Sequence, residues 1–370
     1  MPTLAEEIAA KIAEVGPINF ETFMEMALYH PGLGYYTRES SVIGKSGDFY
    51  TSPHLHGVFG MMIARQIEEM WHAMGRPDRF DIVEMGPGMG YLAGDILRSL
   101  RARDIFGILS YVIVELNPWM RARQAVLVEE FSAVVRWVSS LHDVERFSGC
   151  LVSNELLDAL PVRLIEMEED VKEIFVSTDG ARFVELKRPC SPEVKDYLRD
   201  FSITLPEGYR TEVNLRIRDW LEDAASKLSE GFIFTIDYGY PASSYYDEER
   251  NRGTLLAYYR HAVHEDPYAN VGEQDLTAHV NFSSLKKWGE ALGMTTIGFC
   301  SQGTFLVAMG IDEVLLELWG DSPDLVETAR IKNLLLPQGM GQSHKVMVQY
   351  KGGGQPVLKG FSLRNRMRYL

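Results

Sequence analysis

Gly86, Gly88 and Gly90 alternate with other residues directly after a short apolar run, Asp81 to Met85. A helix-like pattern begins at Tyr91, immediately after the last of these glycines. Where closely spaced glycines join a strand to a helix, backbone N–H groups can approach a ligand closely, with the helix N-terminus behind them. The motif therefore predicts a loop that binds a nucleotide-type ligand, with a tight structural turn as the alternative.

The spacing of the glycines disfavours two familiar nucleotide motifs. The dinucleotide fingerprint Gly-x-Gly-x-x-Gly needs its third glycine at position 91, which is Tyr91 here, so pyrophosphate binding is disfavoured. No Gly-Lys-Ser or Gly-Lys-Thr follows the loop, which excludes a P-loop. Two acids accompany the loop instead: Glu84 precedes it, and Glu115 ends the next apolar run. The place of Glu115 is where an acid accepts hydrogen bonds from ribose hydroxyls.

Three further acids follow predicted strands. Glu155 and Asp158 come just after the apolar run Cys150 to Ser153, and Asp237 ends the run Phe232 to Asp237. In an open α/β sheet these positions face the ligand crevice, and carboxylates pair with guanidinium groups in a bidentate manner. We therefore expect all three acids to be catalytic. The alternatives are an N-cap and a solvated first turn for Glu155 and Asp158, and a loop cap for Asp237.

Histidine and cysteine patterns are less specific. Asp275 and His279 are four residues apart, so on a helix the acid could orient the imidazole as a base, although structural hydrogen bonding is the favoured role. His54 and His56 have no other metal-ligand type clustered beside them, and the three cysteines are widely separated. We therefore predict neither a metal site nor a disulfide.

The rest of the sequence predicts the elements that position these residues. Short apolar runs alternate with helical patterns from residue 80 onward, as expected of a parallel sheet with crossover helices. The predicted strands are Asp81–Met85, Tyr111–Glu115, Val134–Val138, Cys150–Ser153, Phe232–Asp237, Thr295–Cys300 and Lys345–Tyr350. The predicted helices include Leu4–Val15, Phe20–Tyr29, Val58–Met74, Pro192–Asp200, Leu215–Ser229 and Ser283–Leu292.

This pattern predicts an α/β fold in four parts. Residues 1–75 would form an N-terminal helical cap with a glycine-rich loop, and residues 76–161 and 230–350 the core, with inserted helices near 303–336. Residues 162–229 would form an inserted α+β region on the substrate side, because β-like runs there flank an Asp179-Gly180 turn. Residues 351–370 would form a C-terminal tail.

Composition places the chain among ordinary globular enzymes. Its 370 residues are 46% hydrophobic and 24% charged, and the formal net charge is −15. The negative charge disfavours nucleic acid as a partner and suits a cationic one. No apolar run approaches the roughly 20 residues that cross a bilayer, and the first residues lack the pattern of a signal or transit peptide. We expect a cytoplasmic location and no membrane insertion, and leave the oligomeric state open, a dimer included.

The glycine loop and its acids resemble the S-adenosylmethionine-binding signature of class I methyltransferases. The residues that carry this resemblance are Glu84, Gly86, Gly88, Gly90 and Glu115. With the further motifs at 47–53, 154–161, 237–239 and 275–282 in the same order, the chain is similar to the MidA-type methyltransferases. That family includes the mitochondrial complex I assembly factors that methylate a protein arginine. The resemblance runs from about Gly16 to Tyr350.

The resemblance implies a Rossmann-like class I methyltransferase sheet with an N-terminal helical cap, and S-adenosylmethionine as cofactor. It implies that Asp143 meets the adenine amino group. It also implies that Gly47, Asp48, Thr51 and Ser52 close over the cofactor from the N-terminal cap, with a turn and helix start as the alternative. The partner implied is a protein substrate, such as a respiratory complex subunit.

Two positions depart from the family pattern. Met89 stands in the loop where arginine is usual, and His54 follows the Ser-Pro pair where glutamate is usual. Both leave the fold and the cofactor intact but leave the substrate open. The expected function is methylation of an arginine on an assembly partner. The alternatives are a small-molecule methyltransferase and a cofactor-binding assembly chaperone with little catalysis.

Overall fold

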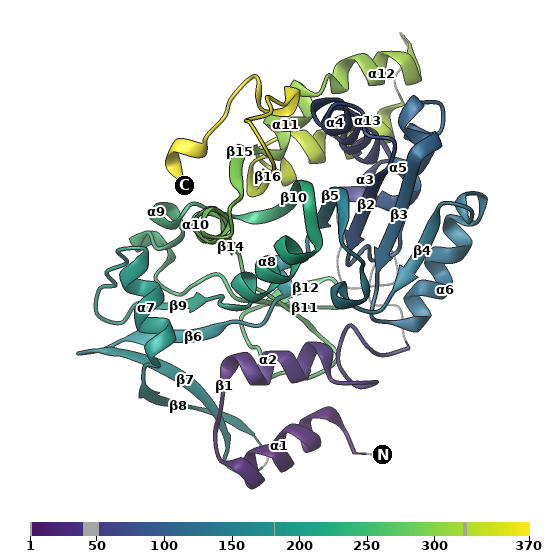
Figure 1. Cartoon of the computed structure of the whole chain (residues 1–370). Helices are drawn as coiled ribbons and strands as arrows, with labels where there is room; N and C mark the ends of the chain where they lie inside the picture. The colour runs from purple at the N-terminus through teal and green to yellow at the C-terminus, as the bar shows by residue number, and fades with distance from the viewer. Residues whose placement is uncertain (1, 40–51, 181, 321–323) are drawn as a thin grey trace. The chain divides into compact units, whose positions relative to one another are not determined.

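The computed structural model describes residues 2–39, 52–180, 182–320 and 324–370, which form two compact units (Figure 1). The first, which we call the sheet unit, consists of Tyr50–Leu156, Trp220–Gly239 and Leu285–Leu370. The second, which we call the accessory unit, consists of Met1–Phe49, Leu157–Asp219 and Tyr240–Ser284. Each unit is thus assembled from three separate stretches of the chain.

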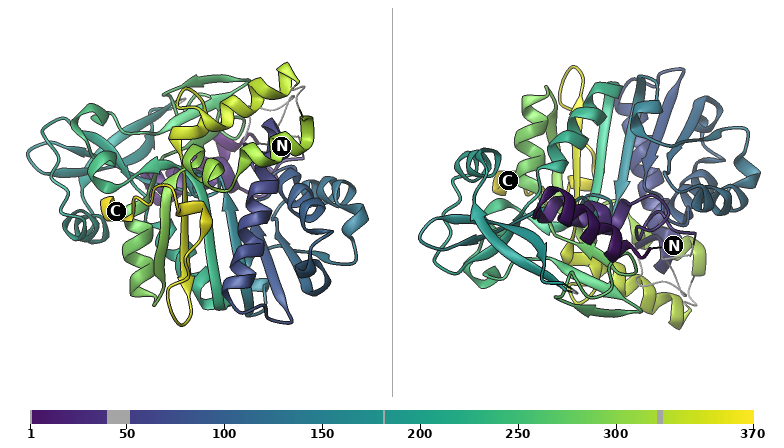
Figure 2. Two further views of the ribbon diagram at one scale, coloured as in Figure 1. Left: turned by 90° about the horizontal axis from the view of Figure 1, so that it is seen from above. Right: turned by 90° about the horizontal axis from the view of Figure 1, so that it is seen from below.

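The strands described along the main path of the sheet have the order β15-β16-β10-β5-β2-β3-β4. Figure 2 shows the chain from above and from below. The bounds of these strands are β2 Phe80–Met85, β3 Leu109–Val114, β4 Val135–Val138, β5 Phe147–Asn154, β10 Leu228–Tyr240, β15 Thr295–Ser301 and β16 His344–Lys351. The central pairs β4–β3, β3–β2, β2–β5 and β5–β10 are parallel, whereas β16 is antiparallel to both β10 and β15. Every strand predicted for the core is present. Strands that are buried on both faces, such as β2 and β5, are recognisable in a sequence as apolar runs.

Helices accompany the strands of the sheet unit, and several of them contribute to its core. The helices are α3 Ser52–Leu55, α4 Val58–Ala73, α5 Tyr91–Leu100, α6 Pro118–Leu127, α11 Gln302–Ala308, α12 Ile311–Trp319, α13 Leu325–Leu335 and α14 Met340–Ser343. Ile63 of α4 and Ile96 of α5 belong to one buried cluster with Phe234 of β10. Because α4 packs into this core, residues 52–75 group with the sheet unit and not with the N-terminal cap in which the sequence placed them.

The first two helices of the accessory unit are α1 (Leu4–Val15) and α2 (Phe20–Tyr29), and both match the predicted ranges. Thr3 caps α1 in a capping box, and the Asn19 side chain accepts a hydrogen bond from the third residue of the next helix. Such caps satisfy N–H groups that a helix leaves unpaired at its start, which is why these boundaries were readable from the sequence.

Two small sheets complete the accessory unit. The larger has the order β1-β7-β6-β9 with β8 paired to β7, and the smaller has the order β12-β11-β13. The bounds are β1 Ile18–Asn19, β6 Arg163–Met167, β7 Val171–Thr178, β8 Phe183–Pro189, β9 Arg210–Val213, β11 Leu256–Tyr259, β12 Ala262–His264 and β13 Asp275–Thr277. The antiparallel pairing of β7 with β8 confirms the hairpin predicted around Asp179-Gly180.

The stretch from Tyr240 to Ser284 differs from the expectation in two ways. It belongs to the accessory unit, whereas the sequence assigned it to the core. Asp275 lies on strand β13, where it pairs with Tyr258 of β11, so the helical spacing considered for Asp275 and His279 does not apply. A four-residue spacing alone cannot separate a helix from a short strand followed by a turn.

The remaining helices of the accessory unit are α7 (Pro192–Asp200) and α9 (Ala242–Tyr245). Helices α8 (Arg216–Lys227) and α10 (Phe282–Ala291) have residues in both units.

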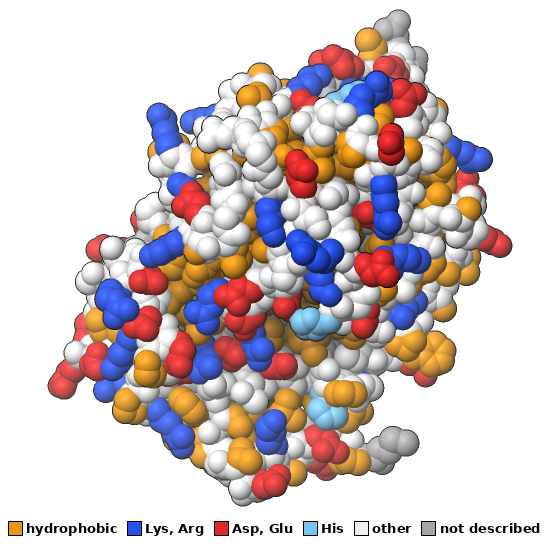
Figure 3. Space-filling view, viewed as in Figure 1, with side chains coloured by type: hydrophobic (Ala, Val, Ile, Leu, Met, Phe, Trp, Pro, Cys, Tyr) orange, Lys and Arg blue, Asp and Glu red, His pale blue; other side chains and the backbone are white. Residues whose placement is uncertain are grey.

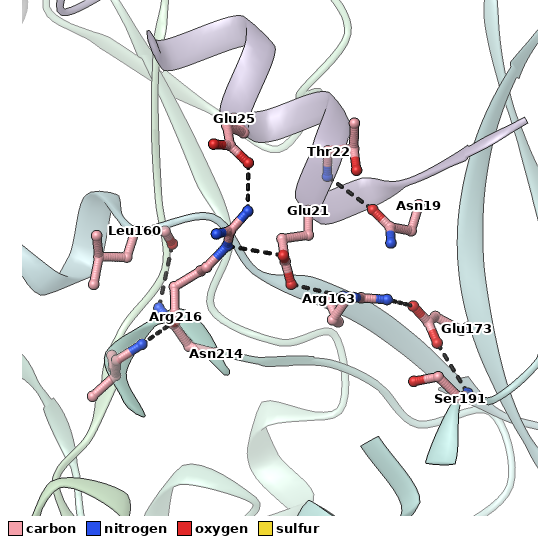
Figure 4. Close-up of polar contacts among 11 residues, drawn as sticks. Asn19, Glu21, Thr22, Glu25, Leu160, Arg163, Glu173, Ser191, Asn214 and Arg216 are labelled. Atoms are coloured by element: carbon pink, nitrogen blue, oxygen red, sulfur yellow. Dashed lines mark hydrogen bonds and ion pairs between the residues drawn. The ribbon is translucent and has the colours of Figure 1, made fainter. Parts of the chain in front are cut away.

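A charged network ties α2 to the larger sheet of the accessory unit (Figure 4). Arg163 of β6 donates to Glu21 of α2 at 2.7 Å and to Glu173 of β7 at 2.6 Å. Arg216 contacts Glu21 at 2.9 Å and also pairs with Glu25. Since Glu173 is almost fully buried, its charge depends on Arg163 for compensation. The network therefore fixes the position of α2 on the sheet.

The distribution of surface charge does not identify a binding face for a partner. On the face of the described chain drawn in Figure 3, acidic and basic side chains are interspersed. Among the described helices, none combines the length and apolar character that crossing a bilayer requires. The buried polar residues are therefore the better guide to the chemistry of the protein.

Candidate active site

The predicted glycine loop connects β2 to α5. Gly86, Gly88 and Gly90 all have positive φ angles, of 66°, 54° and 87°, which L-residues rarely adopt. A Cβ on Gly86 would lie 2.8 Å from the Cδ1 atom of Leu156, so the Leu156 side chain would have to shift to admit it. Among the described residues, no side chain caps the N-terminus of α5. Its first backbone N–H groups therefore remain available for a ligand.

Glu84 lies in the core next to this loop. The Tyr111 hydroxyl donates a 2.6 Å hydrogen bond to its carboxylate. Burial raises the pKa of Glu84 to about 7, and the hydrogen bond from Tyr111 opposes that rise. The described contact of Glu84 is thus with the neighbouring strand β3, and it anchors the end of β2 from which the loop departs.

Glu115 is joined to the glycine loop by a residue that sequence reasoning missed, Gln124 of α6. The Gln124 amide donates to Glu115 Oε2 at 3.0 Å and to the Gly88 carbonyl at 2.7 Å. Its own oxygen accepts a hydrogen bond from the Trp137 indole at 3.0 Å. Glu115 Oε1 accepts a further bond from the Asn117 N–H at 2.8 Å. Burial raises the pKa of Glu115, and these hydrogen bonds oppose the rise.

Glu155 follows β5 in a strained conformation. Its φ of 49° is unusual for a residue with a side chain, and its N–H donates to the Ile236 carbonyl at 2.9 Å. The carboxylate oxygen Oε1 accepts hydrogen bonds from the Ser52 N–H at 3.0 Å and from the Asn154 amide at 3.4 Å. His344 Nε2 lies 3.6 Å from the same oxygen. In the described chain Oε2 accepts none, so one oxygen is held in place and the other is available.

Asp237 supports the turn that follows Glu155. Its buried carboxylate accepts a hydrogen bond from the Leu156 N–H at 3.2 Å and from the Tyr238 N–H at 2.9 Å. These contacts favour the loop-capping role that was the alternative to catalysis. Through Leu156, whose side chain faces Gly86, Asp237 also helps to shape the glycine loop.

His344 is the second site residue that the sequence did not reveal. It begins β16 directly opposite Tyr238 of β10, with the two ring centroids 5.4 Å apart. Its Nδ1 lies 3.1 Å from the Ser343 hydroxyl, and its side chain is only 8% exposed. No sequence motif surrounds it, and its role follows only from the antiparallel register of the last strand.

The other predicted residues have varied placements. Gly47, Asp48 and Thr51 lie outside the described residues. Ser52 is buried and, besides its N–H bond to Glu155, its hydroxyl donates to a side-chain oxygen of α11 at 3.1 Å. Asp143 is exposed and its carboxylate accepts a 3.1 Å bond from the Ser140 N–H within its own turn.

Asp158 belongs to the accessory unit and is buried there. Its carbonyl accepts a hydrogen bond from the Ala278 N–H at 2.9 Å. The Tyr36 hydroxyl donates to Asp275 at 2.8 Å, and burial raises the pKa of Tyr36, with the charges of Asp275 and Asp158 adding to the rise. These contacts group Asp158 with Asp275 and Tyr36.

The residues around the glycine loop fit S-adenosylmethionine. Gly86 and Gly90 leave space that a Cβ would fill, against Leu156 and Gln124 respectively. The uncapped start of α5 offers N–H groups, and Glu115 offers a carboxylate for ribose hydroxyls. Among the described residues no cluster of three histidine, cysteine, aspartate or glutamate side chains could hold a metal ion.

The strand order, the glycine loop after the first core strand and the acid after the second define a class I S-adenosylmethionine-dependent methyltransferase. A family model described as "Putative S-adenosyl-L-methionine-dependent methyltransferase" matches residues 62–300, and the chain belongs to this family. A protein from Burkholderia thailandensis, crystallised with S-adenosyl-homocysteine, is 35% identical, with a TM-score of 0.90 over 99% of this chain and 96% of that one. The cofactor is therefore S-adenosylmethionine.

Curated relatives carry a more specific name. The chain is 29% identical to the mitochondrial protein arginine methyltransferase NDUFAF7 of Rattus norvegicus, over 90% of this chain and 80% of that protein. It is 28% identical to the NDUFAF7 homolog of Drosophila melanogaster, over 95% of this chain and 85% of that protein. These matches confirm the family resemblance inferred from the motifs.

The same relatives overturn the expected location. Those from Drosophila melanogaster, Rattus norvegicus and Homo sapiens are named as mitochondrial proteins. The expectation of a cytoplasmic protein is therefore wrong. It rested on the charge pattern of the first residues, and such a pattern by itself identifies no compartment.

Proposed function

We propose that this protein transfers the methyl group of S-adenosylmethionine to an arginine side chain of a protein partner, such as a subunit of a respiratory complex. The observation that carries the proposal is the asymmetry of the Glu155 carboxylate. Oε1 is held by the Ser52 N–H and the Asn154 amide, and Oε2 accepts no hydrogen bond in the described chain. A fixed carboxylate with one available oxygen suits the N–H groups of a guanidinium.

Each part of the site has a distinct role in this proposal. Gly86, Gly88 and Gly90 hold the cofactor against the backbone, and Glu115, oriented by Gln124, binds its ribose. S-adenosylmethionine supplies a methyl group activated by the positive sulfur to which it is bonded. Glu155 orients the arginine nitrogen for in-line attack and withdraws its proton, the two tasks that a displacement at carbon requires of the protein.

The remaining candidate residues complete the proposal. Asp237 acts through the Leu156 turn, and Asp158 is the second candidate acid for the guanidinium. Asp143 is the candidate for the adenine amino group. Ser52 positions Glu155, and Gly47 and Thr51 are candidates for closing over the cofactor. The names of the relatives support arginine as the acceptor.

Radiolabel transfer tests the proposal. The purified protein is incubated with S-adenosylmethionine carrying a tritiated methyl group and with an extract of the host organism from cells that lack the gene. Protein retained on a filter is hydrolysed, and the label is assigned by amino-acid analysis. We expect label in methylarginine, and label in filtered small molecules or in another amino acid would overturn the arginine assignment.

A Glu155→Gln variant separates an enzyme from an assembly chaperone. The amide keeps the size of the side chain but cannot withdraw a proton or balance the guanidinium charge. We expect transfer to fall by at least about 100-fold, the usual contribution of a general base, while calorimetry shows unchanged binding of S-adenosylmethionine. Unchanged function of this variant in partner assembly would favour the chaperone.

A further inference from the structure

His344 is a buried imidazole with one ring nitrogen directed at Glu155. Its Nε2 has no hydrogen-bond partner in the described chain, although the side chain is only 8% exposed. The nearest acidic oxygen is Glu155 Oε1 at 3.6 Å, a distance too long for a direct hydrogen bond. The other ring nitrogen, Nδ1, lies 3.1 Å from the Ser343 hydroxyl. A buried polar atom without a hydrogen-bond partner destabilises the fold. The position of this nitrogen beside the candidate base therefore needs a functional explanation.

One protonation state of this ring accounts for both of its contacts. If Nδ1 carries the proton and donates it to the Ser343 hydroxyl, Nε2 presents a lone pair to Glu155. Two acceptors then face each other across 3.6 Å, which explains the missing hydrogen bond. A proton that arrives on the Glu155 carboxyl group would bridge the two, and it would convert His344 to an imidazolium paired with an ionised Glu155.

We propose that His344 is a positioning residue that receives, through Glu155, the proton released by the methylated nitrogen. The inference rests on the proposed function of Glu155. Transfer forms a C–N bond and breaks the C–S bond, whose electron pair stays on sulfur. The nitrogen gives up one proton to Oε2 of Glu155, a half-turn of the carboxyl group brings the protonated oxygen opposite His344, and the proton then passes to Nε2. Glu155 is ionised again, and His344 carries the proton until solvent removes it.

The groups that face His344 set the expected pH dependence. Glu155 approaches from the end of β5 and Tyr238 from β10. On its own segment are Ser343 and Lys345, whose ammonium group donates to backbone carbonyls, including that of Ser343 at 2.8 Å. A second imidazole, His54, is influenced by the same acid: burial lowers the pKa of His54, and the charge of Glu155 opposes this. His54 is therefore the matched control for any histidine effect.

The pH profile of kcat tests the inference. It is measured from about pH 5.5 to 8.5, the range in which histidines titrate, for the wild type and for His344→Gln, His344→Asn and His54→Gln. We expect the wild-type kcat to fall at acidic pH, because a proton on Nε2 would close the acceptor that receives the proton from Glu155. In both His344 variants that acidic limb disappears and kcat falls by about 100-fold, with KM for S-adenosylmethionine unchanged. His54→Gln retains the limb.

A second readout requires no activity. Calorimetric titration should give both His344 variants the affinity of the wild type for S-adenosylmethionine, because His344 acts on the proton and not on the cofactor. An acidic limb that persists in both folded His344 variants, or weakened cofactor binding in them, would overturn the inference. If Glu155→Gln is fully active, the proposed function of Glu155 fails instead. If it is inactive while the His344 variants behave as wild type, only the role of His344 fails.

Discussion

Replacing Gln124 by methionine should weaken the binding of S-adenosylmethionine. The effect needs no contact between the new side chain and the cofactor. Gln124 is completely buried and its amide makes three hydrogen bonds, to Gly88, Glu115 and Trp137. Methionine has a similar volume and flexibility, so the change removes the hydrogen bonds while keeping the packing. The Glu115 carboxylate then loses one of the groups that orient it.

The magnitude follows from what each bond does. A hydrogen bond to a charged group contributes about 1.5–3 kcal/mol, and a neutral one about 1 kcal/mol. The two neutral bonds stabilise the fold both with and without cofactor, so their loss lowers the free energy of unfolding by about 2 kcal/mol. Of the three bonds, the one to Glu115 orients the group that we propose binds the ribose. If the loss of this bond lowers the binding free energy by about 1.4 kcal/mol, the affinity for S-adenosylmethionine falls about tenfold.

Calorimetric titration with S-adenosylmethionine measures the binding, and urea unfolding measures the stability. Gln66→Met is the matched control, because Gln66 is an equally buried glutamine of the sheet unit whose partners are Glu69 and the Gly360 N–H. We expect the control to lose stability but to bind the cofactor normally. Wild-type affinity in folded Gln124→Met would refute the reasoning.

Three further variants test other parts of the fold. Gly86→Ala, with a φ of 66° and a Cβ 2.8 Å from Leu156, should cost about 1–2 kcal/mol in conformation alone and lose cofactor binding in calorimetry; normal binding would show that the loop tolerates a Cβ. Burial raises the pKa of Glu84 to about 7, so its folded form holds a proton that the unfolded chain releases, and stability falls between about pH 4.5 and 7. Glu84→Gln should remove about 3 kcal/mol of that fall in urea unfolding at pH 5 and 8; an unchanged slope would contradict the assigned pKa. Arg163→Met strands the buried charge of Glu173 and should lower the unfolding free energy by about 3 kcal/mol, with partial recovery when Glu173 is also made methionine; a single variant as stable as the wild type would show that the network contributes little.

The features readable from the sequence were those with local causes. The range Phe20–Tyr29 was predicted correctly because Asn19 caps the helix and a proline-glycine pair follows it. The core strands were apolar because they are buried on both faces. The glycine loop was recognisable because its conformation admits few other residues.

Features with tertiary causes were not readable. Nothing local marks Gln124, which becomes important only because α6 brings its amide between the Gly88 carbonyl and Glu115. His344 depends on the antiparallel register of β16 against β10, which no motif specifies. Asp275 shows the converse error, since a helical spacing was considered for a residue that lies on a strand.

Glu155 shows why a local rule fails at this site. At a φ of 49°, glycine or asparagine would be favoured, and a glutamate costs about 1 kcal/mol or more. The surroundings enforce the conformation: its N–H bonds to Ile236, and Asp237 holds the next N–H, that of Leu156. The same turn directs Oε1 to the Ser52 N–H and leaves Oε2 available. A glycine here would relieve the strain and remove the carboxylate. The proposed function gives this strain a reason, because it requires an acid where the end of β5 meets the glycine loop through Leu156.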